Sequence, residues 1–188
     1  QMTEEEIALI KSGDATTPFD VLLTTDVEDS LFLRQKATDV DIKRIARDKD
    51  FQHFIKRMRA TLDEENGVGL AAPQVGIGRN IFLFMRIKEE GHPVQVAINP
   101  KVVDKSDETF CFVGDGCLSI PNLSGNTERY TWVEVEYYDE NGKQFRERLS
   151  SASRKGDYTG VIFQHEFDHL NGILFIDRLV PEEVEKED

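Results

Sequence analysis

A His-Glu-x-x-His motif is the feature that most constrains this chain. Residues 164–169 read Gln-His-Glu-Phe-Asp-His. In a helix, His165 and His169 lie one turn apart on the same face, so both imidazoles can bind one metal ion. Glu166 follows His165 directly and can reach a water molecule on that metal. Two nitrogen ligands and a proton-accepting carboxylate are what a metal-dependent hydrolase needs.

The sequence around the motif favours a buried helix. The alternative is an amphipathic helix with two histidines on its polar face. Residues 161–163 (Val-Ile-Phe), Phe167 and Leu170 make the segment mostly apolar. Buried histidine and glutamate side chains need partners, and a metal ion supplies one. Residues 171–172 (Asn-Gly) are a typical helix end. Asp168 either orients an imidazole or is a solvated charge.

The composition is that of a globular domain with its own core. The chain has 188 residues, of which 39% are hydrophobic and 31% charged, and this fits one domain. No apolar run approaches the ~20 residues of a membrane helix. The acidic residues 1–6 do not resemble a secretory signal. A net charge of −13 repels phosphate backbones, so we expect no direct nucleic-acid binding.

Cysteine usage indicates a reducing compartment. The two cysteines, Cys111 and Cys117, cannot form a disulfide scaffold, so we expect a cytoplasmic protein. Cys111 lies in a strand-like apolar run, residues 109–113, and is expected to be a small core residue.

The remaining pattern predicts an α+β fold. Residues 41–66 have apolar side chains at three- and four-residue steps, which predicts a long helix in the N-terminal half, with Gly67 in the left-handed position that ends it. A shorter helix is expected after Thr3, which has capping-box spacing to Glu6. Asn141-Gly142 predicts a hairpin. The segments that read as strands are residues 80–87, 94–98, 101–103, 130–138 and 144–149. We therefore expect mainly antiparallel β-sheets packed around a central helix that carries the motif.

Two histidines leave a catalytic metal site incomplete, because such sites generally keep three protein ligands and one open position. Residues 114–121 (Gly-Asp-Gly-Cys-Leu-Ser-Ile-Pro) offer the thiol of Cys117 in a glycine-containing loop that can approach the helix. A thiolate ligand favours iron or zinc over magnesium or calcium. The alternative is a zinc peptidase with a third ligand downstream, from the acidic tail: Glu182, Glu183, Glu185 or Glu187.

Three stretches together resemble the signature motifs of the peptide deformylase family. They are residues 67–74 (Gly-Val-Gly-Leu-Ala-Ala-Pro-Gln), 116–119 (Gly-Cys-Leu-Ser) and 164–169, and they occur in the family's order. The similarity covers about residues 31–179. It divides the chain into an N-terminal extension (1–30), a deformylase-like catalytic domain (31–180) and an acidic tail (181–188).

The second motif departs from the family pattern at one position. The family usually has glutamate where this chain has Asp115, and the resemblance implies an ion pair between this acid and Arg129. Because aspartate is one methylene shorter, we expect the pair to shift the loop or to require a bridging water.

The resemblance implies the removal of the formyl group from N-formyl-methionyl peptides, with release of formate. Cys117, His165 and His169 would hold one divalent metal ion, usually Fe(II) in the family, although zinc, nickel or cobalt can occupy the site. Glu166 would move the proton of the attacking water, and the Gln74 amide and the Leu118 N–H would stabilise the oxyanion.

The resemblance also implies which residues contact the peptide. Gly69 and Gly116 would present backbone groups to it. Part of the methionine pocket would be formed by Val68, Tyr158, Val161 and Ile162, each of which is equally consistent with a plain core residue. A third alternative is a homologue that binds formyl peptides without turning them over.

Overall fold

The structure, a computed structural model, describes residues 2–181 of the chain. Its helices are α1 (Glu4–Ile10), α2 (Val27–Leu33), α3 (Lys49–Glu65) and α4 (Thr159–Leu170), with 3-10 helices η1 (Ile42–Arg47), η2 (Ala72–Val75) and η3 (Phe175–Arg178). Its strands are β1 (Gly69–Ala71), β2 (Ile81–Met85), β3 (Val94–Lys105), β4 (Thr109–Cys117), β5 (Ile120–Tyr130), β6 (Trp132–Tyr138) and β7 (Gln144–Ser150). Within residues 2–181 no helix has the length and apolar character to cross a membrane.

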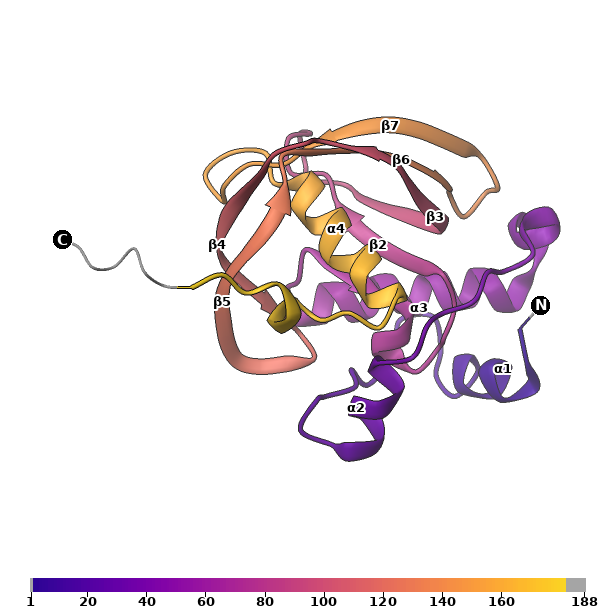
Figure 1. The fold of residues 1–188 in the computed structure, drawn as a ribbon. Coiled ribbons are helices and arrows are strands. Elements are labelled where there is room, and N and C mark those ends of the chain that lie inside the picture. The colour runs from indigo at the N-terminus through magenta and orange to yellow at the C-terminus, as the bar shows by residue number, and fades with distance from the viewer. Residues whose placement is uncertain (1, 182–188) are drawn as a thin grey trace.

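The strands form two antiparallel sheets. Five of them pair in the order β1-β2-β3-β6-β7, while β4 and β5 form a separate hairpin. The motif helix α4 runs through the centre of the molecule, between the larger sheet and the β4–β5 hairpin (Figure 1). The predicted α+β fold, with antiparallel sheets around the motif helix, is confirmed.

Strand β2 of the larger sheet is covered on both faces, and strand alternation decides which residue meets which helix. Ile81 and Leu83 of β2 pack in one apolar cluster with α3. Phe82 and Phe84 point to the opposite face and pack with Phe163 of α4. Both faces of β2 are therefore buried, which explains its continuous apolar sequence.

The prediction of one helix over residues 41–66 is wrong at both ends. A 3-10 helix occupies Ile42–Arg47, and α3 begins only at Lys49, because Asp48 has extended backbone and its carboxylate accepts the first free N–H groups of α3. At the other end Asn66, with φ 54°, takes the left-handed position predicted for Gly67.

Two further predictions about strands are wrong. Residues 94–98 and 101–103 belong to one strand, β3, whose register shifts between Ile98 and Lys101, where Asn99 has φ 51°. Cys111 is exposed, not a core residue. Its neighbour Phe112 is 1% exposed and faces inward, so strand alternation turns Cys111 outward.

The N-terminal segment packs closely against α3. The predicted capping box of Thr3 and Glu6 is present, and α1 lies beside α3 (Figure 1). Ile10 and Phe19 are buried in the same apolar cluster as α3. The division of the chain at residue 30 stays a prediction. Of the predicted acidic tail, residues 182–188 lie outside the described residues.

Arg57 of α3 holds this segment through backbone contacts. It is 4% exposed, and its guanidinium donates to the carbonyl oxygens of Leu9, Ile10, Thr17 and Pro18 at 2.8–3.2 Å. The same group lies 3.9 Å from the ring centre of Phe19. One buried side chain thus donates to four backbone carbonyl groups of the N-terminal segment.

We predict that Arg57→Met lowers the free energy of unfolding by about 1–3 kcal/mol, because four partly buried carbonyl groups lose this donor. Lys56→Met is the matched control, since Lys56 is the exposed neighbour on the same helix. Urea denaturation measures both. An equal loss of unfolding free energy in the two variants would contradict the role of Arg57 in holding the N-terminal segment.

Candidate metal centre and active site

Helix α4 is fixed in rotation and depth by two kinds of contact. The Phe163 ring lies 4.8 Å from the Phe82 ring and 5.3 Å from the Phe84 ring, which anchors one face of the helix on the sheet. The Gln164 amide accepts from the Tyr130 N–H at 2.9 Å and donates to the Tyr130 carbonyl at 3.1 Å, as a neighbouring strand would. These contacts set the direction of the remaining side chains of the motif.

The structure brings Cys117, His165 and His169 together. Their candidate ligand atoms all lie within 4.8 Å of one another, and the Cys117 sulfur is 3.3 Å from His169 Nε2. Both histidines are buried, with 8% and 1% of their surface exposed. One sulfur and two imidazole nitrogens converging in a buried position fit a divalent metal of the iron or zinc type.

Asp115 orients the first of these ligands. Its Oδ1 lies 3.2 Å from His165 Nδ1, which leaves Nε2 of the ring for a metal. Its Oδ2 accepts from Arg129 at 2.8 Å and from the Thr127 hydroxyl at 2.8 Å. The expected consequence of the shorter side chain is wrong in one respect: Asp115 reaches Arg129 directly, and the pair needs no bridging water.

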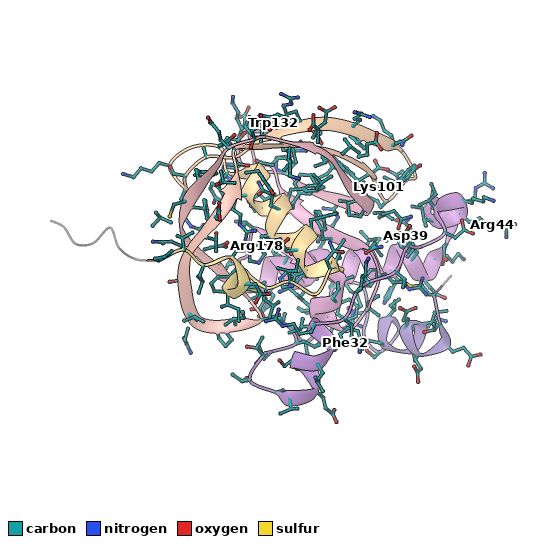
Figure 2. All side chains as sticks on the ribbon, in the orientation of Figure 1. Phe32, Asp39, Arg44, Lys101, Trp132 and Arg178 are labelled. Carbon is teal, nitrogen blue, oxygen red and sulfur yellow. The ribbon has the colours of Figure 1, made fainter. Side chains whose placement is uncertain are left out.

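Asp168 is 7% exposed and pairs with two arginines, so the alternative of a solvated charge is wrong. Its carboxylate accepts from Arg129 at 3.0 Å and from Arg178 at 3.0 and 3.1 Å. Figure 2 labels Arg178 beside α4. Arg129 therefore links Asp168 on the motif helix to Asp115, and through it to His165. No sequence pattern predicts the pairing of Arg178 with Asp168.

Burial shifts the pKa values of the motif side chains. Burial, with the neighbouring His165, holds the pKa of His169 well below its ordinary value, so this imidazole is neutral and can bind a metal. Burial also lowers the pKa of His165, but hydrogen bonds with Asp115 and Cys117 outweigh it and raise that pKa well above the ordinary value.

Glu166 lies in the same buried region without a hydrogen-bonded partner for one of its oxygens. It is 4% exposed, and among residues 2–181 nothing pairs with its Oε1. Burial raises the pKa of Glu166 to about 7. A buried carboxylate with a free acceptor beside a candidate metal centre can hold or release a proton at a bound molecule.

Gln74 is held with its amide nitrogen toward the centre. Its Oε1 accepts from the Ala71 N–H at 2.9 Å, and its Nε2 donates to the Ser119 hydroxyl at 3.1 Å, with the Cys117 sulfur 3.6 Å away. The predicted site residues do not include Ser119, although it stands in the Gly-Cys-Leu-Ser motif. Leu118, which lies between Cys117 and Ser119 in the sequence, lines the same cavity as Gln74.

A cavity of about 290 Å³ opens beside these groups. The residues predicted to contact a peptide all line it, together with side chains that the sequence did not single out, notably Phe112 and Arg154. The predicted lining residues are Val68, Gly69, Gly116, Tyr158, Val161 and Ile162. The glutamates of the alternative downstream site, at positions 182, 183, 185 and 187, lie outside the described residues.

This combination of fold and site defines a class: a metal-dependent hydrolase, with a Cys-His-His group that could hold the metal and a glutamate beside it. The family model for polypeptide deformylase matches residues 23–185. A peptide deformylase of Synechocystis sp. is 37% identical over 150 residues, which cover 79% of this chain and 76% of the relative.

Solved structures agree with this assignment. A peptide deformylase of Synechococcus elongatus in complex with actinonin has a TM-score of 0.73 and 36% identity, over 88% of this chain and 80% of that one. A Met-Ala-Ser-bound deformylase of Acinetobacter baumannii has a TM-score of 0.74 and 30% identity, over 87% and 99%. The chain belongs to the peptide deformylase family.

We predict that Gly69→Ala disables the site without unfolding the protein. A Cβ atom at this position would lie 2.6 Å from Glu166 Oε2 and 2.9 Å from its Cγ, so the buried carboxylate must move. A displacement of this size is expected to lower turnover by about 100-fold.

Gly78→Ala is the control for this variant, since its Cβ would meet only Phe32 at an ordinary 3.6 Å. Steady-state kinetics and metal analysis measure both variants. Wild-type turnover in Gly69→Ala would contradict the tight packing of Gly69 on Glu166.

We predict that Asp115→Asn weakens metal affinity about 10–100-fold, because His165 loses the carboxylate that orients it. Asp107→Ala, which removes an exposed carboxylate nearby in the sequence, is expected to change nothing. Competition with a metal chelator gives the two affinities. Unchanged affinity in Asp115→Asn would mean that His165 is oriented by other contacts.

Proposed function

We propose that this protein removes the formyl group from N-formyl-methionyl peptides of newly made proteins and releases formate. The observation that carries the proposal is the convergence of Cys117, His165 and His169 next to Glu166, beside a cavity lined by both apolar and polar side chains. Membership of the deformylase family supports the same reaction. The Met-Ala-Ser tripeptide in the Acinetobacter structure corresponds to a deformylated product of such a peptide.

The chain's own groups have separate tasks in this reaction. A divalent ion held by Cys117, His165 and His169 would supply Lewis acidity, which lowers the pKa of a water molecule. Glu166 accepts the proton of the attacking water and passes it to the leaving amine. Gln74 Nε2 and the Leu118 N–H donate to the formyl oxygen as negative charge develops on it.

The side chains around the cavity bind the peptide. Val68, Tyr158, Val161 and Ile162 offer an apolar surface to the methionine side chain, and their common position in the cavity wall supports this. Gly69 and Gly116 present backbone groups to the peptide. Asp115 and Arg129 hold His165 in place by the contacts described above.

We infer Fe(II) as the native metal from the family, with zinc, nickel or cobalt able to replace it in a purified sample. The thiolate in the donor set supports a metal of this kind. We further infer a cytoplasmic location and no direct binding of nucleic acid, because the chain has two cysteines and a net charge of −13.

Neither alternative is favoured. A zinc peptidase would need a third ligand from residues 182–187, whereas Cys117 already meets both histidines. A binding protein without turnover would not need a carboxylate such as Glu166 beside the metal ligands. The family match and the complete set of site residues favour an active deformylase.

We predict that Glu166→Gln retains its metal but loses turnover by about 10²–10⁴-fold, because the amide cannot accept the proton of the water. Formate release from formyl-Met-Ala-Ser by anaerobically prepared, metal-loaded protein is the assay. Glu64→Gln, at an exposed position on α3, makes the same chemical change away from the site and should match the wild type. Normal turnover in Glu166→Gln would exclude Glu166 from proton transfer.

A further inference from the structure

Arg154 places a positive charge at the active-site cavity. It lies on the segment between β7 and α4 and lines the cavity, and its side chain is exposed. The guanidinium lies 5.2 Å from the ring centre of Phe112 and 5.4 Å from that of Tyr158, two other residues of the cavity wall. Its Nε and Nη2 donate to the Gly114 carbonyl at 3.2 and 2.8 Å. These contacts hold the charge in a defined place.

The hydrogen bonds with Gly114 use one edge of the guanidinium. Arginine has five N–H donors in a fixed plane, so the edge formed by Nη1 and Nη2 remains for a further acceptor. Among residues 2–181 no carboxylate forms an ion pair with Arg154, whereas Arg129 and Arg178 both pair with Asp168. A guanidinium edge of this kind is suited to a carboxylate of a bound ligand.

We propose that Arg154 selects formyl peptides that carry an acidic side chain at one of the two positions after the formyl-methionine, an inference that rests on the proposed function. The formyl end must reach Cys117 and the two histidines, and the methionine occupies the apolar wall that includes Val161 and Ile162. The next one or two residues then pass the rim of the cavity, where Arg154 lies. The protein as a whole has a net charge of −13 and repels acidic peptides, so a preference for them requires a local cation.

The test measures kcat/KM of the metal-loaded protein for formyl-Met-Xaa-Ser, with aspartate, alanine or lysine at Xaa, and for formyl-Met-Ala-Asp. We expect the better of the two acidic peptides to be favoured over its alanine counterpart by about three- to fivefold, the effect of one solvent-exposed ion pair. We expect the lysine peptide to be the poorest. Added salt should reduce the preference.

Two matched variants locate the effect. Arg154→Gln should remove the preference, whereas Lys155→Gln should retain it, because Lys155 is an exposed neighbour of the same charge that does not line the cavity. An equal loss of rate for all peptides in Arg154→Gln would overturn the proposal, since the arginine would then only position Gly114. Absence of a preference in the wild type, or its loss in Lys155→Gln, would also overturn it.

A binding measurement separates this inference from the proposed function. Calorimetry gives the affinity of the metal-loaded protein for the deformylated peptides Met-Asp-Ser, Met-Ala-Asp and Met-Ala-Ser, which need no turnover. If no formate is released but an acidic peptide binds more tightly, and only Arg154→Gln abolishes the difference, the inference stands and the proposed function fails. If formate is released but neither rates nor affinities distinguish the peptides, the inference fails alone.

Discussion

The site depends on a network of buried charges around α4. A helix enclosed on almost every side carries His165, Glu166, Asp168 and His169, and burying such groups is costly unless each has a partner. Arg129 supplies the link, because it pairs with Asp168 on the helix and with Asp115 on β4. Each of these carboxylates also has further donors. The same ion pairs that make the burial of α4 tolerable therefore fix the position of the strand that ends at Cys117.

Close approach of the backbone completes this arrangement at two glycines. A Cβ atom on Gly160 would lie 2.6 Å from the Ser150 carbonyl oxygen, so only glycine lets the first turn of α4 rest on the end of β7. Gly69 of β1 likewise lets the Glu166 side chain pack directly against the strand backbone, because a Cβ atom there would lie 2.6 Å from Glu166 Oε2. The distance of α4 from the sheet is thus set at one end of the helix by backbone contact. In the middle of the helix it is set by the ring contacts of Phe163 and by the hydrogen bonds of the Gln164 amide. The chemical groups are held by packing that leaves them little freedom to move.

Local signals in the sequence predict many of the elements, whereas the errors concern helix caps, as at Asp48 and Asn66, and long-range packing. The Thr3 capping box, the Asn141-Gly142 hairpin and the motif helix depend on neighbouring residues, so the sequence contains them. An apolar run does not indicate which face of a strand is buried, and for that reason the prediction that Cys111 is a core residue is wrong. The contacts of Asp168 join residues far apart in the chain, so its pairing with Arg178 had no local sign.

The donors proposed for the oxyanion come from two separate turns, and a third segment holds these turns together. Gln74 lies in η2 and Leu118 follows β4, so their separation is not set by either element alone. The Leu22 N–H donates to the Gln74 carbonyl at 2.7 Å, and the Thr24 N–H donates to the Ser119 carbonyl at 2.9 Å. Because residues 22–24 bridge both turns, and Arg57 anchors the segment before them, stability in the N-terminal region bears directly on the geometry around the formyl oxygen.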